Sequence, residues 1–107
     1  MPRTPVDIRD NPESSRVEAV LDGEVVGFSE YKARTDTVRS FLHTEVDDRM
    51  EGQGVGGQLV RGVMDVAREQ GFKILPYCSF VRSYMRDHED THDVLAPGGR
   101  LEPDPEE

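Results

Sequence analysis

Four glycines lie within six residues of this chain, in the segment 51–57, EGQGVGG. This glycine loop follows an apolar, strand-like run and precedes an amphipathic helical pattern. Glycine accepts positive φ and lets another group approach the main chain closely. Where such a loop opens a helix, its free N–H groups and the helix dipole favour an anion, typically a phosphate. The segment therefore predicts a strand–loop–helix unit with a phosphate cradle, formed by Glu51, Gly52, Gln53, Gly54, Val55, Gly56 and Gly57.

The sequence before the glycine loop predicts an antiparallel meander of three strands. Residues 17–21 alternate with a period of two, and Asp22-Gly23 is a strong hairpin signal. Two further strand-like runs follow, over 25–33 and 38–46, separated by a polar turn.

The sequence after the loop predicts a helix over about 55–70, capped by Gly71, and then a short strand over 72–76. A right-handed crossover would set this strand parallel to residues 38–46. A second helix would begin at Ser79 as its cap and bury Phe80, Val81, Tyr84 and Met85. The expected fold is α/β (α+β), a small mixed sheet with one crossover helix and one short helix.

At 107 residues the chain fits one small domain. We place this domain at 1–95, with 1–15 as a loose N-terminal arm that joins the sheet late. Residues 96–107 hold three prolines and no periodic apolar residues, so we expect a disordered acidic tail.

The charge of the chain is −9, from 13 basic and 22 acidic residues, which argues against a nucleic-acid partner. One cysteine, no signal-peptide layout and no apolar run of about 20 residues predict a cytoplasmic protein without a membrane partner. His88 and His92 have a metal-like i, i+4 spacing, but they stand among acidic residues, and we expect no metal site there.

The loop also matches the spelling G-x-G-x-x-G of a dinucleotide fingerprint at Gly52, Gly54 and Gly57. That fingerprint needs a strand running straight into the first glycine and an acidic residue about 20 positions later. Here four polar residues intervene and the next strand ends in Pro76-Tyr77. A Walker loop is excluded because no Gly-Lys-Ser/Thr follows.

Three motif blocks, in order, resemble a minimal single-domain subgroup of the GNAT superfamily of acetyl-CoA-dependent N-acetyltransferases. They are His-Thr-Glu-Val at 43–46, Glu-Gly-Gln-Gly-Val-Gly at 51–56, and Pro-Tyr-Cys-Ser-Phe-Val at 76–81. The superfamily motif has Gln or Arg where this chain has Glu51, but glutamate is usual there in the subgroup. The resemblance covers about residues 15–95.

The resemblance implies acetyl-CoA as co-substrate, with its pyrophosphate held by main-chain N–H groups of the glycine loop. It also implies that the pantetheine arm lies along the strand edge of Thr44, Glu45 and Val46. The helices that build an acceptor pocket in larger relatives are not apparent, so we expect an open site for an amine, possibly of a protein or peptide. The sequence leaves open a monomer or a weak homodimer.

His43 and Cys78 are the candidate catalytic residues. Histidine exchanges protons near neutral pH, so His43 could act as general base, or it could be an ordinary strand residue. Cys78 precedes a predicted helix, a position that favours a thiolate, and could carry the acyl group, merely line the acyl site, or pack in the core. Tyr84 lies where GNAT enzymes often have a thiolate-protonating tyrosine, but its spacing favours the core.

Three functions fit these residues. The leading one is an acetyl-CoA-dependent N-acetyltransferase. The alternatives are a non-catalytic coenzyme A or acyl-CoA binding module, and a small interaction protein whose glycine loop is only a tight turn.

Overall fold

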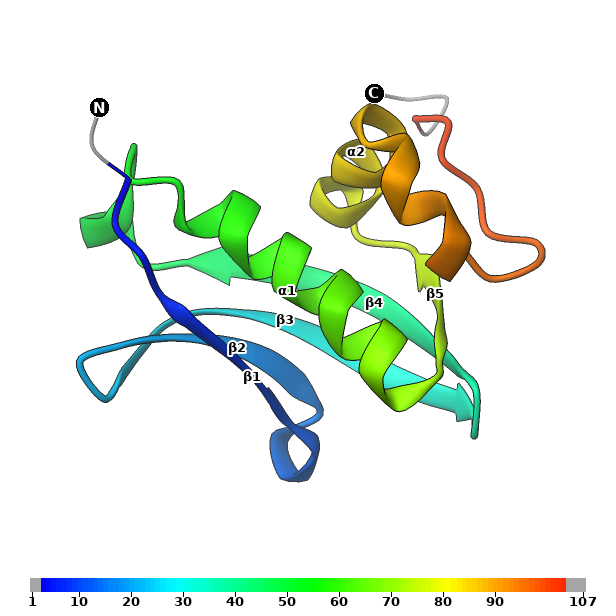
Figure 1. Cartoon of the computed structure of the whole chain (residues 1–107), viewed down its shortest axis with the longest axis horizontal. Coiled ribbons are helices and arrows are strands. Elements are labelled where there is room, and N and C mark those ends of the chain that lie inside the picture. The colour runs from blue at the N-terminus through cyan, green and yellow to red at the C-terminus, as the bar shows by residue number, and fades with distance from the viewer. Residues whose placement is uncertain (1–2, 104–107) are drawn as a thin grey trace.

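The computed structural model describes residues 3–103, and residues 1–2 and 104–107 lie outside the described part. A five-stranded sheet in the order β1-β2-β3-β4-β5 carries α1 across one face, and α2 and η3 gather beside β5 (Figure 1). The elements in chain order are β1 (Asp7–Asn11), η1 (Pro12–Ser14), β2 (Arg16–Leu21), β3 (Glu24–Thr35), β4 (Val38–Val46), η2 (Asp48–Met50), α1 (Val55–Gln70), β5 (Lys73–Pro76), α2 (Ser79–Asp87) and η3 (Glu89–Val94).

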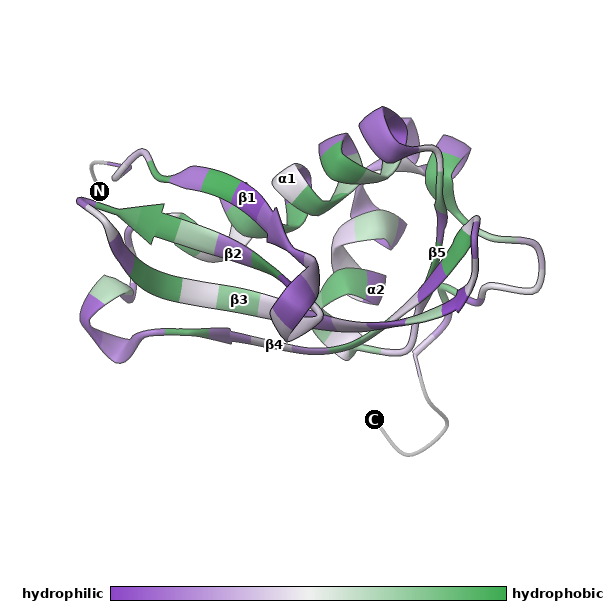
Figure 2. Ribbon diagram, turned by 90° about the horizontal axis from the view of Figure 1, so that it is seen from below, coloured by the Kyte–Doolittle hydropathy of each residue, from purple (hydrophilic) through white to green (hydrophobic). Residues whose placement is uncertain are grey.

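The predicted meander and crossover are confirmed. Strands β2, β3 and β4 pair antiparallel, and β5 pairs parallel to β4 after the helix α1. The β2–β3 turn has positive φ at both central residues, Asp22 and Gly23, as a tight hairpin requires. Apolar and hydrophilic residues both occur along β2 (Figure 2), where Val17 and Ala19, on either side of Glu18, are fully buried in the core.

The N-terminal arm differs from the expected loose segment, because residues 7–11 form the edge strand β1. Its Ile8 packs against Gly62 of α1, where an added Cβ would lie 2.3 Å from the Ile8 Cγ2. The lack of a side chain at Gly62 thus lets β1 approach the helix closely. Only short alternation among charged residues marks this strand in the sequence.

Helix α1 supplies the centre of the core. The predicted apolar stripe is fully buried against the sheet, and it comprises Leu59, Val60, Val63, Met64 and Ala67. Gly71 ends the helix in the left-handed conformation, with φ 76°, and its N–H donates to the Ala67 carbonyl at 2.8 Å.

The second helix differs from the expectation in its start and its buried face. Cys78 takes the N-cap position, Ser79 is already helical, and no side chain caps the helix. Phe80 is 47% exposed, whereas Arg82, two residues later, is buried with Val81 and Met85.

The start of the C-terminal segment also differs from the expected disordered tail, since Ala96 and Leu101 contact the domain. The Ala96 N–H donates to the Ile74 carbonyl at 2.8 Å, and Leu95 forms an isolated parallel β-bridge with Ile74. Leu101 packs against the core. These are isolated apolar contacts on the outer edge of β5, and they leave no periodic pattern. The remainder of the predicted tail, 104–107, lies outside the described residues.

Neither α-helix within residues 3–103 has the length and apolar character needed to cross a bilayer.

Candidate active site

The glycine loop turns the chain from η2 into α1 and leaves open space at the first helical turn. Gly52 and Gly54 have φ of 78° and 75°, so both positions favour glycine. Gly54 is the N-cap of α1, and no side chain caps the helix. A Cβ added at Gly57 would meet nothing within 4 Å. The first-turn N–H groups therefore face a space that an anion could fill.

A surface pocket of about 390 Å³ lies against this loop, and we call it the phosphate pocket. Its lining residues are Arg3, Gly52, Gln53, Gly54, Gly57, Tyr84 and His88. Three residues of the predicted cradle do not line the pocket, namely Glu51, Val55 and Gly56. Glu51 is exposed, which fits a cradle built from main-chain groups.

Arg3 lines one side of the phosphate pocket, and the segment 3–6 that carries it is bound to the glycine loop, a role that the sequence did not reveal. The Thr4 N–H donates to the Gln53 carbonyl at 3.0 Å. The Gln58 side chain donates to the Thr4 carbonyl at 2.6 Å and accepts from the Val6 N–H at 3.1 Å. These hydrogen bonds fix the segment on the loop (Figure 1, dark blue beside the start of α1). No periodic pattern in the first residues marks it.

Tyr84 and His88 form the opposite wall. Their rings stack with centroids 3.9 Å apart, and the His88 Nδ1 lies 2.7 Å from the Tyr84 carbonyl oxygen. Because a carbonyl only accepts, Nδ1 carries the proton and donates. His92 makes a similar bond to the Met85 carbonyl, so both histidines bond to the main chain of α2.

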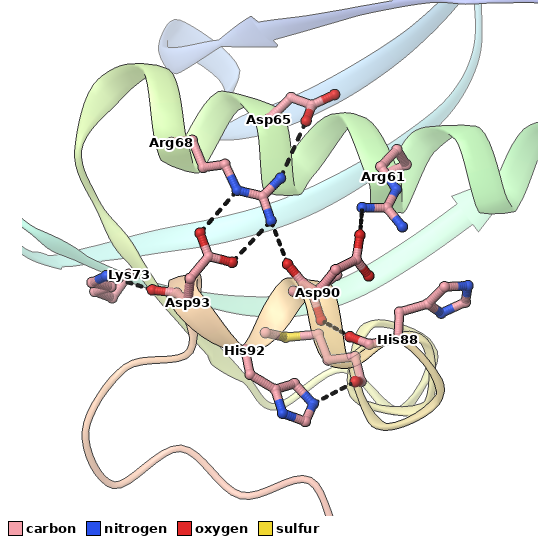
Figure 3. Close-up of polar contacts among 10 residues, drawn as sticks. Arg61, Asp65, Arg68, Lys73, His88, Asp90, His92 and Asp93 are labelled. Carbon is pink, nitrogen blue, oxygen red and sulfur yellow. Dashed lines mark hydrogen bonds and ion pairs between the residues drawn. The ribbon is translucent and has the colours of Figure 1, made fainter.

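Ion pairs between α1 and η3 hold this wall in place (Figure 3). Arg61 pairs with Asp90 at 2.8 Å and Arg68 pairs with Asp93 at 2.9 Å. Hydrogen bonds from Arg61 hold the pKa of Asp90 below its usual value, and those from Arg68 do the same to the pKa of Asp93. Both carboxylates thus stay charged near neutral pH, and η3 stays anchored to the helix that begins at the loop.

Strands β4 and β5 separate near the middle of β4. Their last paired residues are Phe41 and Pro76, followed by a hydrogen bond of 2.8 Å from the Cys78 N–H to the Phe41 carbonyl. The register with β3 shifts at Leu42, a β-bulge. Beyond it, Thr44, Glu45 and Val46 pair with β3 on one edge, and within residues 3–103 no strand lies on the other.

Cys78 lies at this separation of the strands, buried and 7% exposed. Its Sγ donates to the Thr44 Oγ1 at 3.4 Å, and that oxygen shares a 2.9 Å hydrogen bond with the buried Ser29. Phe80, two residues on, reaches the glycine loop, since a Cβ at Gly56 would lie 2.8 Å from its ring. Phe80 thus lies between the glycine loop and the point where β4 and β5 separate.

His43 lies on the opposite face of β4 from Thr44, because neighbouring strand residues alternate. Its Nε2 is 3.6 Å from a carboxylate oxygen of Glu45, and its ring meets Phe28 edge-on at 6.5 Å. No contact joins His43 to Cys78 in the described part of the chain. The two predicted catalytic residues therefore approach the same strand from opposite faces.

A second surface pocket, of about 470 Å³, lies next to His43, and we call it the acidic groove. Glu45, Asp47 and Asp48 contribute three carboxylates, and Phe28 contributes an aromatic face. One cation, Arg16, also lines the groove and lies 4.7 Å from the centre of the Phe28 ring. Hydrogen bonds from Arg49 lower the pKa of Asp47 to about 2. The groove forms only where β3 and β4 pair, so no pattern along the sequence marks it.

Comparison with known proteins supplies the family. A family model for GCN5-related N-acetyl-transferases matches residues 16–94. A GCN5-like protein from Staphylococcus aureus, solved by NMR, is 25% identical with a TM-score of 0.63, over 84% of this chain and 87% of that one. Ard1 from Thermoplasma volcanium is 28% identical with a TM-score of 0.50, over 58% of this chain and 43% of that one. No curated protein matches. The chain belongs to the GCN5-related N-acetyltransferase family, and both the loop geometry and the sheet topology agree with this assignment.

Proposed function

We propose that this N-acetyltransferase moves the acetyl group of acetyl-CoA to an amine of a protein or peptide. The observation that supports this most is the continuity between two parts of the surface. Gly57 lines the phosphate pocket, and the ring of Phe80 in α2 lies against the neighbouring Gly56. At the start of α2, Cys78 donates a hydrogen bond to Thr44 on the open edge of β4. A long cofactor with phosphates at one end and a thioester at the other fits this course.

The phosphate end of coenzyme A would bind at the glycine loop. Main-chain N–H groups of Gly54 to Gly57 and the positive end of the α1 dipole favour the pyrophosphate. The pantetheine arm would then bond to the free edge of Thr44, Glu45 and Val46, as an added strand does. Side-chain identity matters little for such contacts.

The acetyl group would lie beside Cys78 and Thr44, where β5 leaves β4. We propose direct attack by the amine, with Cys78 lining the acyl site, because its thiol donates a hydrogen bond to Thr44 and is buried. The amine nitrogen attacks the thioester carbonyl, the C–S bond breaks, and coenzyme A leaves as a thiolate that takes up a proton.

The amine would enter the gap between β4 and β5 from the other face of β4, where His43 lies, and His43 would accept its proton. Glu45 would stabilise the imidazolium that forms, since its carboxylate lies 3.6 Å away. The acidic groove beside it would hold a cationic acceptor. The groove is an open surface, which suits an extended peptide or a protein side chain better than an enclosed small molecule.

The first experiment measures acetyl transfer from acetyl-CoA to a set of lysine-containing peptides by mass spectrometry. His43→Ala should lower kcat about 10²- to 10⁴-fold with unchanged affinity for coenzyme A, and added imidazole should restore part of the rate. Lys32→Ala, an exposed position on β3, is the control and should retain full activity. Full activity of His43→Ala would refute the role of His43 as base.

The second experiment separates direct transfer from an acyl-cysteine route. Intact mass after incubation with acetyl-CoA should show no acetyl adduct at Cys78, and Cys78→Ala should keep measurable transfer. An adduct that disappears in Cys78→Ala, together with loss of transfer, would replace direct attack by the covalent route. Absence of acetyl-CoA binding by the wild-type chain would refute the proposed function itself.

A further inference from the structure

Among the described residues, 3–103, Arg3 is a cation without a carboxylate partner, in a protein that is acidic overall. Most arginines here are paired, including those at positions 9, 16, 39, 49, 61, 68 and 100. Within residues 3–103, no ion pair or side-chain hydrogen bond joins Arg3 to another residue, although acidic residues outnumber basic ones by 22 to 13. Its charge is available to an external anion.

The main chain places Arg3 at the phosphate pocket. Its aliphatic stem packs over the glycine loop, since a Cβ at Gly54 would lie 3.3 Å from the Arg3 Cγ. The next residue, Thr4, is hydrogen-bonded to Gln53 within the loop and to Gln58 immediately after it. The position of Arg3 is therefore set by the same loop that would bind the pyrophosphate.

We infer that Arg3 recognises the phosphates of the cofactor and makes the enzyme select coenzyme A thioesters over phosphate-free pantetheine thioesters. This inference rests on the proposed function. A guanidinium binds phosphate oxygens through paired N–H donors, which a single ammonium cannot reproduce. It also offsets the repulsion that a protein of charge −9 exerts on an anionic cofactor. The main-chain cradle alone carries no net charge.

NMR titration of the full chain with coenzyme A and with pantetheine tests the inference, because it measures weak as well as tight binding. Arg3→Ala should weaken coenzyme A binding about tenfold and leave pantetheine binding unchanged. Arg3→Lys should lie between wild type and Arg3→Ala. Arg100→Ala removes the same charge far from the pocket lining, at an exposed position, and should change neither affinity.

Positioning by the N-terminal segment has its own test. Gln58→Ala removes the hydrogen bonds to Thr4 and Val6, so it should weaken coenzyme A binding when Arg3 is present and add little in the Arg3→Ala background. Equal effects in both backgrounds would show that Gln58 acts independently of Arg3 and would overturn the positioning role.

Two results overturn the recognition by Arg3. One is unchanged coenzyme A affinity in Arg3→Ala. The other is an equal loss of coenzyme A and pantetheine affinity, which would mean that the substitution only disturbs the loop. Wild-type protein that binds no coenzyme A would instead refute the proposed function, and this inference with it.

Discussion

Substituting Gly57 by alanine should stabilise the protein and weaken its hold on the cofactor. Gly57 lies in the first turn of α1, and a Cβ there meets nothing within 4 Å in the free protein. Alanine is favoured over glycine in a helix by about 0.5–1 kcal/mol. For a chain of this size that corresponds to a rise in Tm of about 2–5 °C.

The same methyl group would project into the phosphate pocket, which Gly57 lines. A phosphate oxygen could then no longer reach the N–H groups behind it. Loss of one charge-assisted hydrogen bond costs about 1.5–3 kcal/mol, so the Kd for coenzyme A should rise about 10- to 100-fold.

Thermal unfolding followed by circular dichroism gives the Tm, and calorimetry gives the Kd for coenzyme A. Gly62→Ala in the same helix is the matched control for stability, because its methyl group meets Ile8 and not open space. An unchanged Kd in Gly57→Ala would refute the placement of the phosphates against the first turn of α1. A fall in Tm for Gly57→Ala would show that the added methyl group meets other atoms, and would refute the open space at that position.

Three further predictions concern stability, pH and the cofactor path. Gly62→Ala should destabilise the protein by about 1–3 kcal/mol in denaturant unfolding, because the new Cβ would lie 2.3 Å from the Ile8 Cγ2 and push β1 off the helix; unchanged stability would contradict the close packing. Glu18→Gln should cost about 1–3 kcal/mol at pH 7, since Glu18 is 1% exposed and bound by three side chains, including Arg16 at 2.8 Å. Burial raises the pKa of Glu18, but the hydrogen bonds outweigh this effect and the net pKa is lowered. The contribution of Glu18 to stability is therefore present above its unfolded pKa and lost as pH falls through its folded pKa. Urea unfolding from pH 7 to 3 should show the free energies of unfolding of wild type and variant converging at the acidic end, and a difference that widens there would contradict this. Phe80→Ala should leave the free energy of unfolding within about 1 kcal/mol, because the ring is 47% exposed, yet it should weaken acetyl-CoA binding in calorimetry; equal binding would show that the cofactor does not pass this ring.

The sequence predicted most of the sheet and the crossover helix, for identifiable reasons. Strand β4 and helix α1 have long periodic patterns with glycine or a polar turn at their ends, and both have the predicted bounds. The hairpin at Asp22-Gly23 follows from backbone requirements that few other residue pairs meet. Local chemistry determines these elements.

The segments whose structure differs from the sequence-based prediction depend on contacts between residues far apart in the chain. Strand β1 is defined by the fit of Ile8 against Gly62, and Ala96 is held by the Ile74 carbonyl. Neither contact leaves a periodic mark. The same holds for the candidate site, where the glycine loop was evident from composition but Arg3 and His88 reach the phosphate pocket only through the fold.

The phosphate pocket draws on the N-terminal segment, the middle and the last third of the chain, with consequences for synthesis. Arg3 is made early, the glycine loop midway, and His88 only after α2, whose wall then depends on the still later Asp90 and Asp93. A chain emerging from the ribosome has the loop but not the complete pocket. The pocket is therefore complete only once η3 has been made, and cofactor should protect the finished protein from proteolysis while leaving nascent chains that end before η3 unprotected.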